Sequence, residues 1–337
     1  MEKYLKEMKS YKTMATCGLF MKITKILYFF VFILCSLFFY FFVSKFQWSV
    51  IPELSIVSLF LIFVLTVADT FCHVSLIRLQ AKILHYRSSF FKTYLVLTSS
   101  LTANYITPVK IGIPIRIFLY KEILKIKSDD GISMVLVEMF LGLLIPALIS
   151  IAGLPMFFPG YGVIPVFIFI FFLLSLVIIL CKIDEKAFLF TNKIFSLKIL
   201  QRILDLLFRS RSSLKKFGFF NLFEIGTFDI FLLFLQAVRL QIVLSLFSID
   251  LSFFETLTAL VASVTLGNIS LIPMGAGVRD VSFVLLLKQV GVPAETAIAC
   301  AAVQRLFSPG WPLLLGLISS NYLCLSDLLK KKQKKVP

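Results

Sequence analysis

The sequence predicts an all-α, polytopic integral membrane protein with about six full spans and two oppositely oriented re-entrant helical hairpins. Hydrophobic residues make up 59% of the 337 residues and charged residues only 15%, against about 25% in ordinary soluble domains. A soluble fold could not cover so apolar a core with polar faces. The apolar runs are solid rather than alternating, which disfavours a transmembrane β-barrel.

Six apolar runs are candidate spans, and several of them approach or reach the roughly 20 residues that a helix needs to cross a bilayer core. They cover residues 26–43, 56–68, 134–152, 164–180, 230–247 and 313–325. The first run follows a lysine-rich start, but no small-residue cleavage site follows it. A retained span is therefore favoured over a signal peptide.

Positive charge is concentrated in a few connections, which should be cytoplasmic. Of the 34 Lys and Arg residues, 29 fall in residues 1–25, 73–92, 110–130, 182–218 and 330–337. We therefore expect a protein of the cell membrane with both termini in the cytoplasm, as a segment 1–25 and a basic tail 326–337. Residues 182–218 alternate apolar and basic side chains, which favours an amphipathic segment on the cytoplasmic membrane surface.

Two broken segments are too short on either side of the break to cross the membrane twice. Residues 93–120 are broken near Pro108 and lie between basic connections, which predicts a re-entrant hairpin from the cytoplasm. Residues 253–290 are broken near Pro273. They must begin and end outside if the tail is cytoplasmic, which predicts a re-entrant hairpin from the outside.

The two breaks resemble each other, which indicates an inverted repeat of the kind that transporters use. The recurring residues are Asn104, Pro108, Gly112 and Arg116 in the first break and Asn268, Pro273, Gly277 and Arg279 in the second. Broken backbone survives in hydrocarbon only where protein or a water-filled cavity surrounds it. Each outgoing half-helix should begin near the midplane, where its free N–H groups and its dipole favour an anion.

A mid-membrane site for a phosphate group is the resulting hypothesis. Arginine can bind phosphate through two hydrogen bonds, and glycine lets a ligand approach the backbone. The candidate ligands are Arg116, Arg239, Gly275, Gly277, Arg279 and Arg305.

The carboxylates Glu138 and Asp280 are expected to hold these arginines or to meet an amine on the headgroup, and Glu138 is also a candidate for relaying a proton. A structural interpretation stays open, in which Asp280 neutralises Arg279 or pairs with Arg305 to lock the fold. Arg239 is expected either to face a polar cavity or to extend outward to the interface.

Two further acidic features carry weaker expectations. Asp69 lies in the second predicted span, directly after the apolar run 56–68, and the sequence indicates no partner for it. Asp129 and Asp130 directly precede the third apolar run, and we expect them to cap the helix that contains it.

Other kinds of site find little support in the sequence. The six Cys residues show no C-x-x-C spacing, and no acidic cluster surrounds His73 or His85, so we expect neither a metal site nor a cofactor. The phosphate-loop motif of ATPases does not occur, and no catalytic constellation is found, so we expect neither an ATP-driven pump nor an enzyme. Nucleic acid is not expected as a partner, and the oligomeric state stays open.

Two blocks of the sequence resemble a known family. The stretch "NYITPVKIGIPIRIFLYKE" at 104–122, followed by Glu138, and "LIPMGAGVRD" at 271–280, followed by "VGVPAETAIACAAVQRLF" at 290–307, resemble the signature blocks of the flippase-like family. This family is also called the lysylphosphatidylglycerol synthase transmembrane region. The resemblance assigns to the first block Asn104, Pro108, Gly112 and Arg116, and to the second Pro273, Gly275, Gly277, Val278, Asp280 and Arg305.

The chain departs from the family pattern at three positions. It has Ile113 where an acidic residue usually follows the glycine, Met139 where an arginine often follows the glutamate, and Asp280 where glutamate is usual. The sequence ends at Pro337, shortly after the last predicted span. We therefore expect a stand-alone member without the soluble synthase domain.

The resemblance implies a lipid flippase, which would move a phosphate-bearing headgroup through the midplane site. Its cargo would be a membrane phospholipid or a polyprenyl-phosphate-linked lipid. Two alternatives stay open: an accessory protein or enzyme of lipid-linked glycan or cell-envelope assembly, and a transporter of small solutes that uses the same hairpins.

Overall fold

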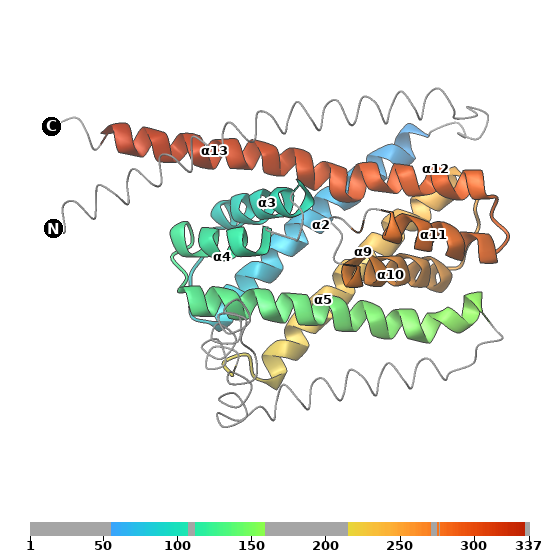
Figure 1. Cartoon of the computed structure of the whole chain (residues 1–337), viewed down its shortest axis with the longest axis horizontal. Helices are drawn as coiled ribbons and strands as arrows, with labels where there is room; N and C mark the ends of the chain where they lie inside the picture. The colour runs from blue at the N-terminus through green and yellow to red at the C-terminus, as the bar shows by residue number, and fades with distance from the viewer. Residues whose placement is uncertain (1–54, 107–111, 159–214, 271–274, 276, 334–337) are drawn as a thin grey trace, which may run out of the picture.

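The computed structural model describes residues 55–106, 112–158, 215–270, 275 and 277–333. Every regular element in these residues is helical, which confirms the predicted helical class for this part of the chain. In chain order the elements are α2 (Ile56–Ile83), α3 (Phe90–Ile106), α4 (Gly112–Glu122), α5 (Ser128–Phe157), α9 (Phe219–Leu246), α10 (Phe253–Ile269), α11 (Val278–Gln289), α12 (Ala294–Arg305), the π-helical segment η4 (Leu306–Gly310) and α13 (Trp311–Gln333) (Figure 1).

Three of these helices, α2, α5 and α9, are long and apolar enough to cross a membrane. They contain the predicted spans 56–68, 134–152 and all but the last residue of 230–247, and the predicted span 313–325 lies within α13. The predicted spans 26–43 and 164–180 fall outside the described residues, as do the segment 1–25 and most of 182–218. The total of six spans therefore stays a prediction.

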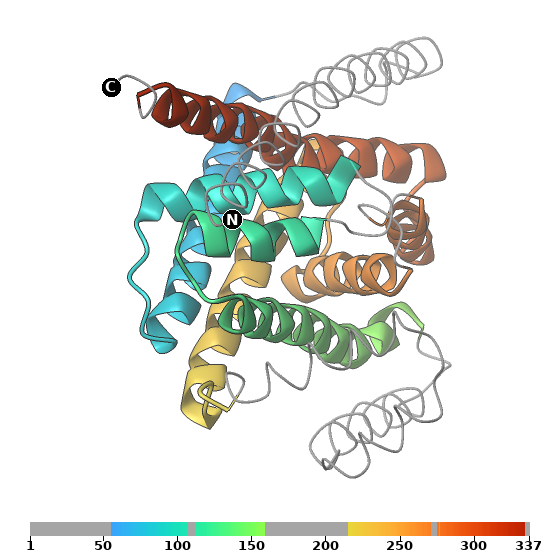
Figure 2. The ribbon, with the colours of Figure 1, turned by 60° about the vertical axis from the view of Figure 1, so that its left-hand side comes forward.

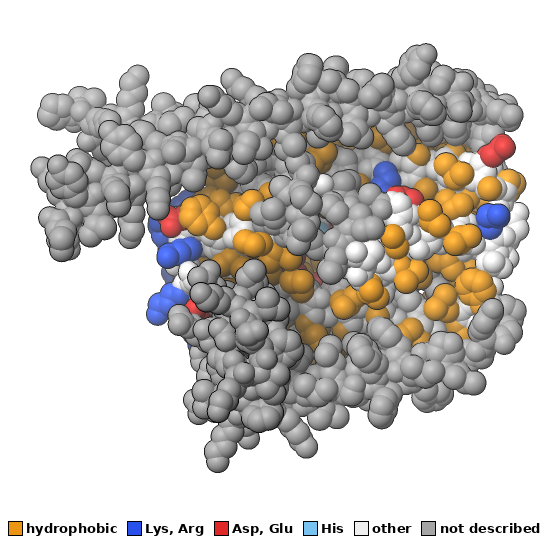
Figure 3. All heavy atoms as spheres, viewed as in Figure 1, with side chains coloured by type: hydrophobic (Ala, Val, Ile, Leu, Met, Phe, Trp, Pro, Cys, Tyr) orange, Lys and Arg blue, Asp and Glu red, His pale blue; other side chains and the backbone are white. Residues whose placement is uncertain are grey.

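The surface of the described helices is apolar, whereas many of their polar side chains are inside. Phenylalanine and other large apolar residues are exposed, such as Phe60 at 62%, Phe220 at 85% and Ile318 at 64%. Buried positions include many small hydroxyl residues, which let membrane helices pack closely and form hydrogen bonds. In Figure 3 hydrophobic side chains cover much of the described face, and most of its charged side chains lie at its edges. This distribution is the one expected of a protein surrounded by lipid.

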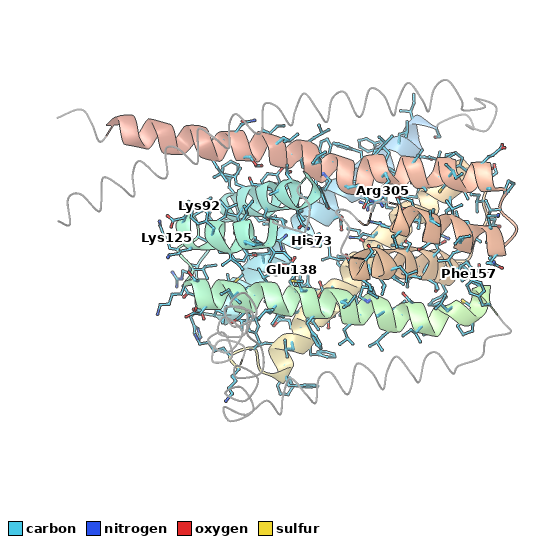
Figure 4. The ribbon with its side chains drawn as sticks, in the orientation of Figure 1. His73, Lys92, Lys125, Glu138, Phe157 and Arg305 are labelled. Atoms are coloured by element: carbon cyan, nitrogen blue, oxygen red, sulfur yellow. The ribbon has the colours of Figure 1, made fainter. Side chains whose placement is uncertain are left out.

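Two pairs of shorter helices lie side by side within the bundle. In the first pair, Gly112 at the start of α4 packs so closely on Ser100 and Asn104 of α3 that a methyl group would not fit. In the second pair, Gly275 lies directly before α11 and against the backbone of Gly267 in α10. The α3–α4 pair lies at the Lys92 and Lys125 end of the molecule, and the α10–α11 pair lies toward the Phe157 end (Figures 1 and 4).

The two pairs are held by the long helices of the opposite part of the chain. Gly316 of α13 lies against Thr102 and the Thr98 carbonyl of α3, and the Thr98 hydroxyl donates a hydrogen bond to Ser319 at 2.8 Å. Gly153 of α5 lies in the same way against Thr258 of α10. The turned view shows α13 beside α3 and α5 beside α10 (Figure 2). A long helix from each half of the chain thereby packs against a short helix of the other half.

The second acidic expectation, that Asp129 and Asp130 cap the following helix, was wrong. The N-cap of α5 is Lys127, and both aspartates lie within the first helical turn. Asp130 instead accepts hydrogen bonds from the Tyr86 hydroxyl at 2.6 Å and from Lys216 Nζ at 3.3 Å. Its carboxylate therefore ties three separate segments together at the basic end, while still facing the positive end of the helix dipole.

The chain from 294 to 333 forms one path of three helical parts. The α-helical hydrogen bonding of α12 changes to the π-helical segment η4 directly after Arg305 and returns to α-helix at Trp311. Pro309 lies within η4, and proline cannot donate the backbone hydrogen bond of a regular helix. Such π segments are frequent at functional sites.

Candidate functional site

Three of the arginines predicted as ligands are paired with carboxylates on neighbouring helices. The pairs are Arg116 with Glu138, Arg239 with Asp69, and Arg305 with Asp280. Figure 4 places Glu138 and Arg305 in the middle of the molecule, between its Lys125 end and its Phe157 end. Charges at this depth of an apolar bundle are costly, so each pair compensates most of its own charge.

The first pair joins α4 to α5. Arg116 Nη1 lies 2.6 Å from Glu138 Oε1 and 2.7 Å from Oε2, and Arg116 Nε donates to the Ser100 hydroxyl at 2.9 Å. The Arg116 side chain is buried, and the buried Tyr120 is one of its electrostatic neighbours. The guanidinium is therefore held by groups from α3, α4 and α5, as the expected pairing of Glu138 with a cation requires.

The second pair joins α2 to α9. Arg239 Nη1 lies 3.6 Å from Asp69 Oδ2, and the Gln236 amide donates to Asp69 Oδ1 at 3.0 Å. Arg239 is 3% exposed and also donates to the Thr66 hydroxyl at 3.4 Å. The alternative in which Arg239 extends outward is therefore wrong. The structure also supplies the partners of Asp69, which the sequence did not indicate.

The third pair joins α11 to α12. Arg305 Nε donates to Asp280 Oδ1 at 2.7 Å and Arg305 Nη2 donates to Oδ2 at 3.0 Å, which is a bidentate contact. The Gly277 N–H donates to Asp280 Oδ2 at 3.1 Å. Of the two structural alternatives for Asp280, the structure has the pair with Arg305 and not the one with Arg279. Gly277 has φ of 81°, a conformation that favours glycine at this helix start.

Arg279 differs from the other three arginines. Among the residues that the structure describes, no carboxylate lies within ion-pair distance of Arg279, and no described side chain accepts a hydrogen bond from it. Its electrostatic neighbours include the cations Arg305 and Arg239. Gly267 and Gly275 pack against the Arg279 side chain, and a methyl group at either glycine would press on Arg279 Cβ. Two glycines thus make room for a cation that has no ion-pair partner among the described residues, and its neighbouring carboxylate, Asp280, is bound to Arg305.

Tyr105 lies among these groups and was not recognised in the sequence. It occupies the last turn of α3 and is an electrostatic neighbour of Arg279, Asp69, Arg116 and Arg305. At least one member of each ion pair, together with Arg279, therefore lies near the end of α3. Its place directly after Asn104 in the first block was the signal that could have identified it.

Asp229 of α9 is the second residue that sequence reasoning missed. Its Oδ2 is buried and has no hydrogen-bond partner, and its charged neighbour is Glu138 of α5. A carboxylate directly before the predicted span 230–247 was the signal that could have identified it.

The remaining predicted residues are placed as follows. Asn104 lies in the last turn of α3, where its Oδ1 is buried without a hydrogen-bond partner, and Asn268 lies in the last turn of α10. Gly275 has φ of 60°. Pro108 and Pro273 lie outside the described residues. In the described part of the chain, no group of three His, Cys, Asp or Glu residues could hold a metal ion.

Comparison with known proteins agrees with this architecture. The family model described as lysylphosphatidylglycerol synthase TM region matches residues 26–316. This range includes all the ion pairs above, the paired short helices and the three long apolar helices. A comparison with curated proteins finds no match. An all-helical described structure with apolar spans, and a family match over most of the sequence, together show that the chain is a membrane protein that belongs to the lysylphosphatidylglycerol synthase transmembrane-region family.

Proposed function

We propose that this protein is a lipid flippase that moves a phosphate-bearing headgroup across the cell membrane, through a midplane site between two broken-helix hairpins. The cargo is a membrane phospholipid or a polyprenyl-phosphate-linked lipid. No covalent step is required, so the protein acts as a transporter rather than an enzyme. Its family relates to the handling of membrane lipids, which supports a lipid cargo.

In this proposal the α3–α4 and α10–α11 pairs are re-entrant hairpins from opposite sides. At 1.5 Å per residue, α3 and α10 are about 25 Å long and α4 and α11 about 17 Å, less than the roughly 30 Å of a hydrocarbon core. The basic connections around Lys92 and Lys125 support a cytoplasmic entry for the first pair and cytoplasmic termini.

Helix lengths support an inverted repeat. Both α2 and α9 have 28 residues, both α3 and α10 have 17, and α4 and α11 have 11 and 12. In each half the second short helix is joined by an ion pair to the helix that follows it. A site between two such repeats is a common arrangement in transporters.

The unpaired state of Arg279 is the observation that carries the proposal. A charged side chain near the bilayer centre costs at least about 2.5 kcal/mol, so it is rarely retained without a function. Arg279 lies in the first turn of α11, where the free N–H groups and the helix dipole also favour an anion. A lipid phosphate would supply the missing negative charge. Arg116, Arg239 and Arg305 would contribute to the same positive field while their carboxylates hold them in place.

The test is movement of headgroup-labelled lipids in proteoliposomes that contain the native chain or a variant. The lipids are phosphatidylglycerol, an aminoacylated lipid and a polyprenyl phosphate. The site variants are Arg279→Gln, Arg305→Ala and Asp280→Asn. The matched control is Lys288→Ala, which removes an exposed cation from the last turn of the same helix.

We expect one lipid class to move with the native chain and the control, and at least tenfold more slowly with Arg279→Gln. Equal movement by the folded Arg279→Gln protein would remove Arg279 from the site. Movement of none of the three lipids, with correctly folded native protein, would favour a role in envelope assembly or in the transport of small solutes.

A further inference from the structure

We infer that His73 is a further headgroup-binding residue, which binds the anion as an imidazolium, so that one proton enters the site with each phosphate-bearing headgroup. This inference deepens the proposed function and rests on it. His73 lies on α2, one turn after Asp69. Figure 4 places it in the middle of the molecule, together with Glu138.

The His73 side chain is exposed although it lies on the buried face of its helix. In an α-helix, the residues four after, seven before and seven after a given residue share its face. For His73 these are Ile77, Thr66 and Gln80, which are 2%, 1% and 0% exposed, whereas the side chain of His73 is 36% exposed. Its exposure therefore indicates accessible space inside the helix bundle, and not contact with the surrounding lipid.

An ion pair lies next to the imidazole. Asp69 Oδ1 lies 3.9 Å from His73 Nε2 and accepts a hydrogen bond from the Gln236 amide at 3.0 Å. Asp69 Oδ2 lies 3.6 Å from Arg239 Nη1. The Arg239 side chain is only 4% exposed, so it cannot meet an anion in the accessible space while it holds Asp69. His73 is therefore the residue through which this group of side chains meets a headgroup.

The elements that pack on α2 bring no second counter-charge to the imidazole. They are α3, α5, α9 and η4. Apart from the groups at the basic end, their titratable side chains are Tyr94 and Tyr105 of α3, Glu138 of α5, and Asp229 and Arg239 of α9. Glu138 is bound to Arg116. Of the charged groups that the structure describes, Asp69 alone lies within 4 Å of His73, and Arg239 already balances its charge.

The accessible space beside His73 belongs to the same site as Arg279. Tyr105 has both Asp69 and Arg279 as electrostatic neighbours, and Arg239 is a neighbour of Arg279. A phosphate group at the start of α11 would therefore be approached by Arg279 from one side and by His73 of α2 from another.

This arrangement makes the proton and the headgroup depend on each other. Imidazole exchanges a proton near neutral pH, and an imidazolium has two N–H donors. One donor can turn toward Asp69 Oδ1 while Arg239 stays on Oδ2, and the other can bind a phosphate oxygen. Without an anion, the added positive charge is costly in an apolar bundle. The proton therefore strengthens the binding of the anion, and the anion strengthens the binding of the proton by the same factor.

The accessible space is tested on the native protein without any cargo. Diethyl pyrocarbonate modifies neutral imidazole that solvent can reach, and mass spectrometry distinguishes the two histidines of the chain. His85 is exposed in the loop after α2 and serves as the internal control. We expect both histidines to react. Reaction of His85 without reaction of His73 would overturn the inference, because a headgroup could not reach His73 either.

The linkage is tested by the binding of two tail-labelled lipids in detergent at pH 8 and pH 7, phosphatidylglycerol in one arm and a polyprenyl phosphate in the other. The proteins are the native chain, His73→Gln and His85→Gln, which makes the same change at an exposed site. We expect the native chain and His85→Gln to bind one lipid up to about tenfold more tightly at pH 7, as one linked proton requires. His73→Gln should lose this dependence. A phosphate monoester also titrates near this range, so in that arm the difference between the native chain and His73→Gln is the measure.

The outcomes separate this inference from the proposed function. Binding of neither lipid at either pH would overturn both. Native binding that is equal at the two pH values, or a pH dependence that persists in His73→Gln, would overturn the inference alone. If His73→Gln does not fold, protection of the native protein decides. The bound lipid should slow the reaction of His73 with diethyl pyrocarbonate at least fivefold and leave that of His85 unchanged, and an unprotected His73 would overturn the inference.

Discussion

In the ion pair of Arg305 with Asp280, the helices that carry the acid and the arginine are exchanged relative to the pair of Arg116 with Glu138. In the α11–α12 pair the short helix supplies the acid and the next helix the arginine, at 2.7 Å. In the α4–α5 pair the short helix supplies the arginine and the next helix the acid, at 2.6 Å. Each half therefore holds its short helix by one ion pair, but the charge that the short helix carries is reversed.

The Arg116–Glu138 pair should stabilise the fold only while both members are present. Replacing Glu138 by Gln leaves a buried guanidinium without a counter-charge, which typically costs about 3–5 kcal/mol. We expect Glu138→Gln to lower the melting temperature in detergent clearly, and the double variant Arg116→Gln with Glu138→Gln to recover most of the loss. Additive losses in the double variant would show that the two residues act independently.

The steric clashes that alanine would cause at Gly316 and at Gly153 should differ in how far a second substitution can relieve them. Alanine at Gly153 would press on the Thr258 side chain, whereas alanine at Gly316 would press on both the Thr102 side chain and the Thr98 backbone. Each change should cost about 1–3 kcal/mol through overpacking. We expect Thr258→Ala to restore most of the stability that Gly153→Ala loses, because it removes the two nearest atoms, and Thr102→Ala to restore less of that lost by Gly316→Ala, because the Thr98 backbone remains.

Gly142 supplies the control for these steric effects. It lies within α5, and nothing surrounds the position of an added methyl group. Gly142→Ala should therefore be neutral or slightly stabilising, because alanine favours a helix more than glycine does.

Complete rescue of Gly316→Ala by Thr102→Ala would mean that α13 and α3 separate more easily than their backbone contact indicates.

The helix start in the second block could be predicted because each of its glycines is required there for a physical reason of its own. The sequence predicted an outgoing half-helix after the second break, and in the structure α11 begins at Val278, directly after Gly277 at positive φ. Gly275 is required by its contact with Gly267 as well as by its backbone conformation. A broken helix with glycine at the break is a local pattern, so the printed sequence is sufficient to predict it.

The pairing of charges could not be predicted in the same way. Asp69 and Arg239 are on helices far apart in the sequence, and only the packing of α2 on α9 brings them together. Asp229 was overlooked because its carboxylate neighbour, Glu138, lies on a helix far away in the sequence. Asp130 was assigned to a cap because the Tyr86 and Lys216 contacts, which come from separate segments, have no signature in the local sequence.

The conformation of Gly277 should affect the site more than the fold. Gly277→Ala and Gly291→Ala both place alanine at a φ of about 80°, where an added methyl group meets no neighbour. Each should lose about 1–2 kcal/mol of stability through backbone strain. Only Gly277 donates to Asp280, so only Gly277→Ala should also disturb the Asp280–Arg305 pair and slow lipid movement in proteoliposomes. If the two variants transport lipid equally, the backbone conformation at the start of α11 does not affect the site.

Arg279 should lower the stability of the protein, although lipid movement depends on it. Because Arg279 has no ion-pair partner among the described residues, Arg279→Gln removes an unfavourable charge and should raise stability by about 1 kcal/mol or more. Arg305→Gln should do the opposite, because it leaves Asp280 without its bidentate partner. The measurement is the melting temperature of the two variants in the same detergent without lipid cargo.

The comparison of these two arginines separates a ligand-binding charge from a structural one. A functional Arg279 is tolerated because its compensation comes from the headgroup, so its removal stabilises the empty protein and abolishes transport together. If Arg279→Gln is destabilised as strongly as Arg305→Gln, then Arg279 has a permanent partner within the chain. Its role would then be structural, and the phosphate would have to be bound by arginines that must first leave their carboxylates.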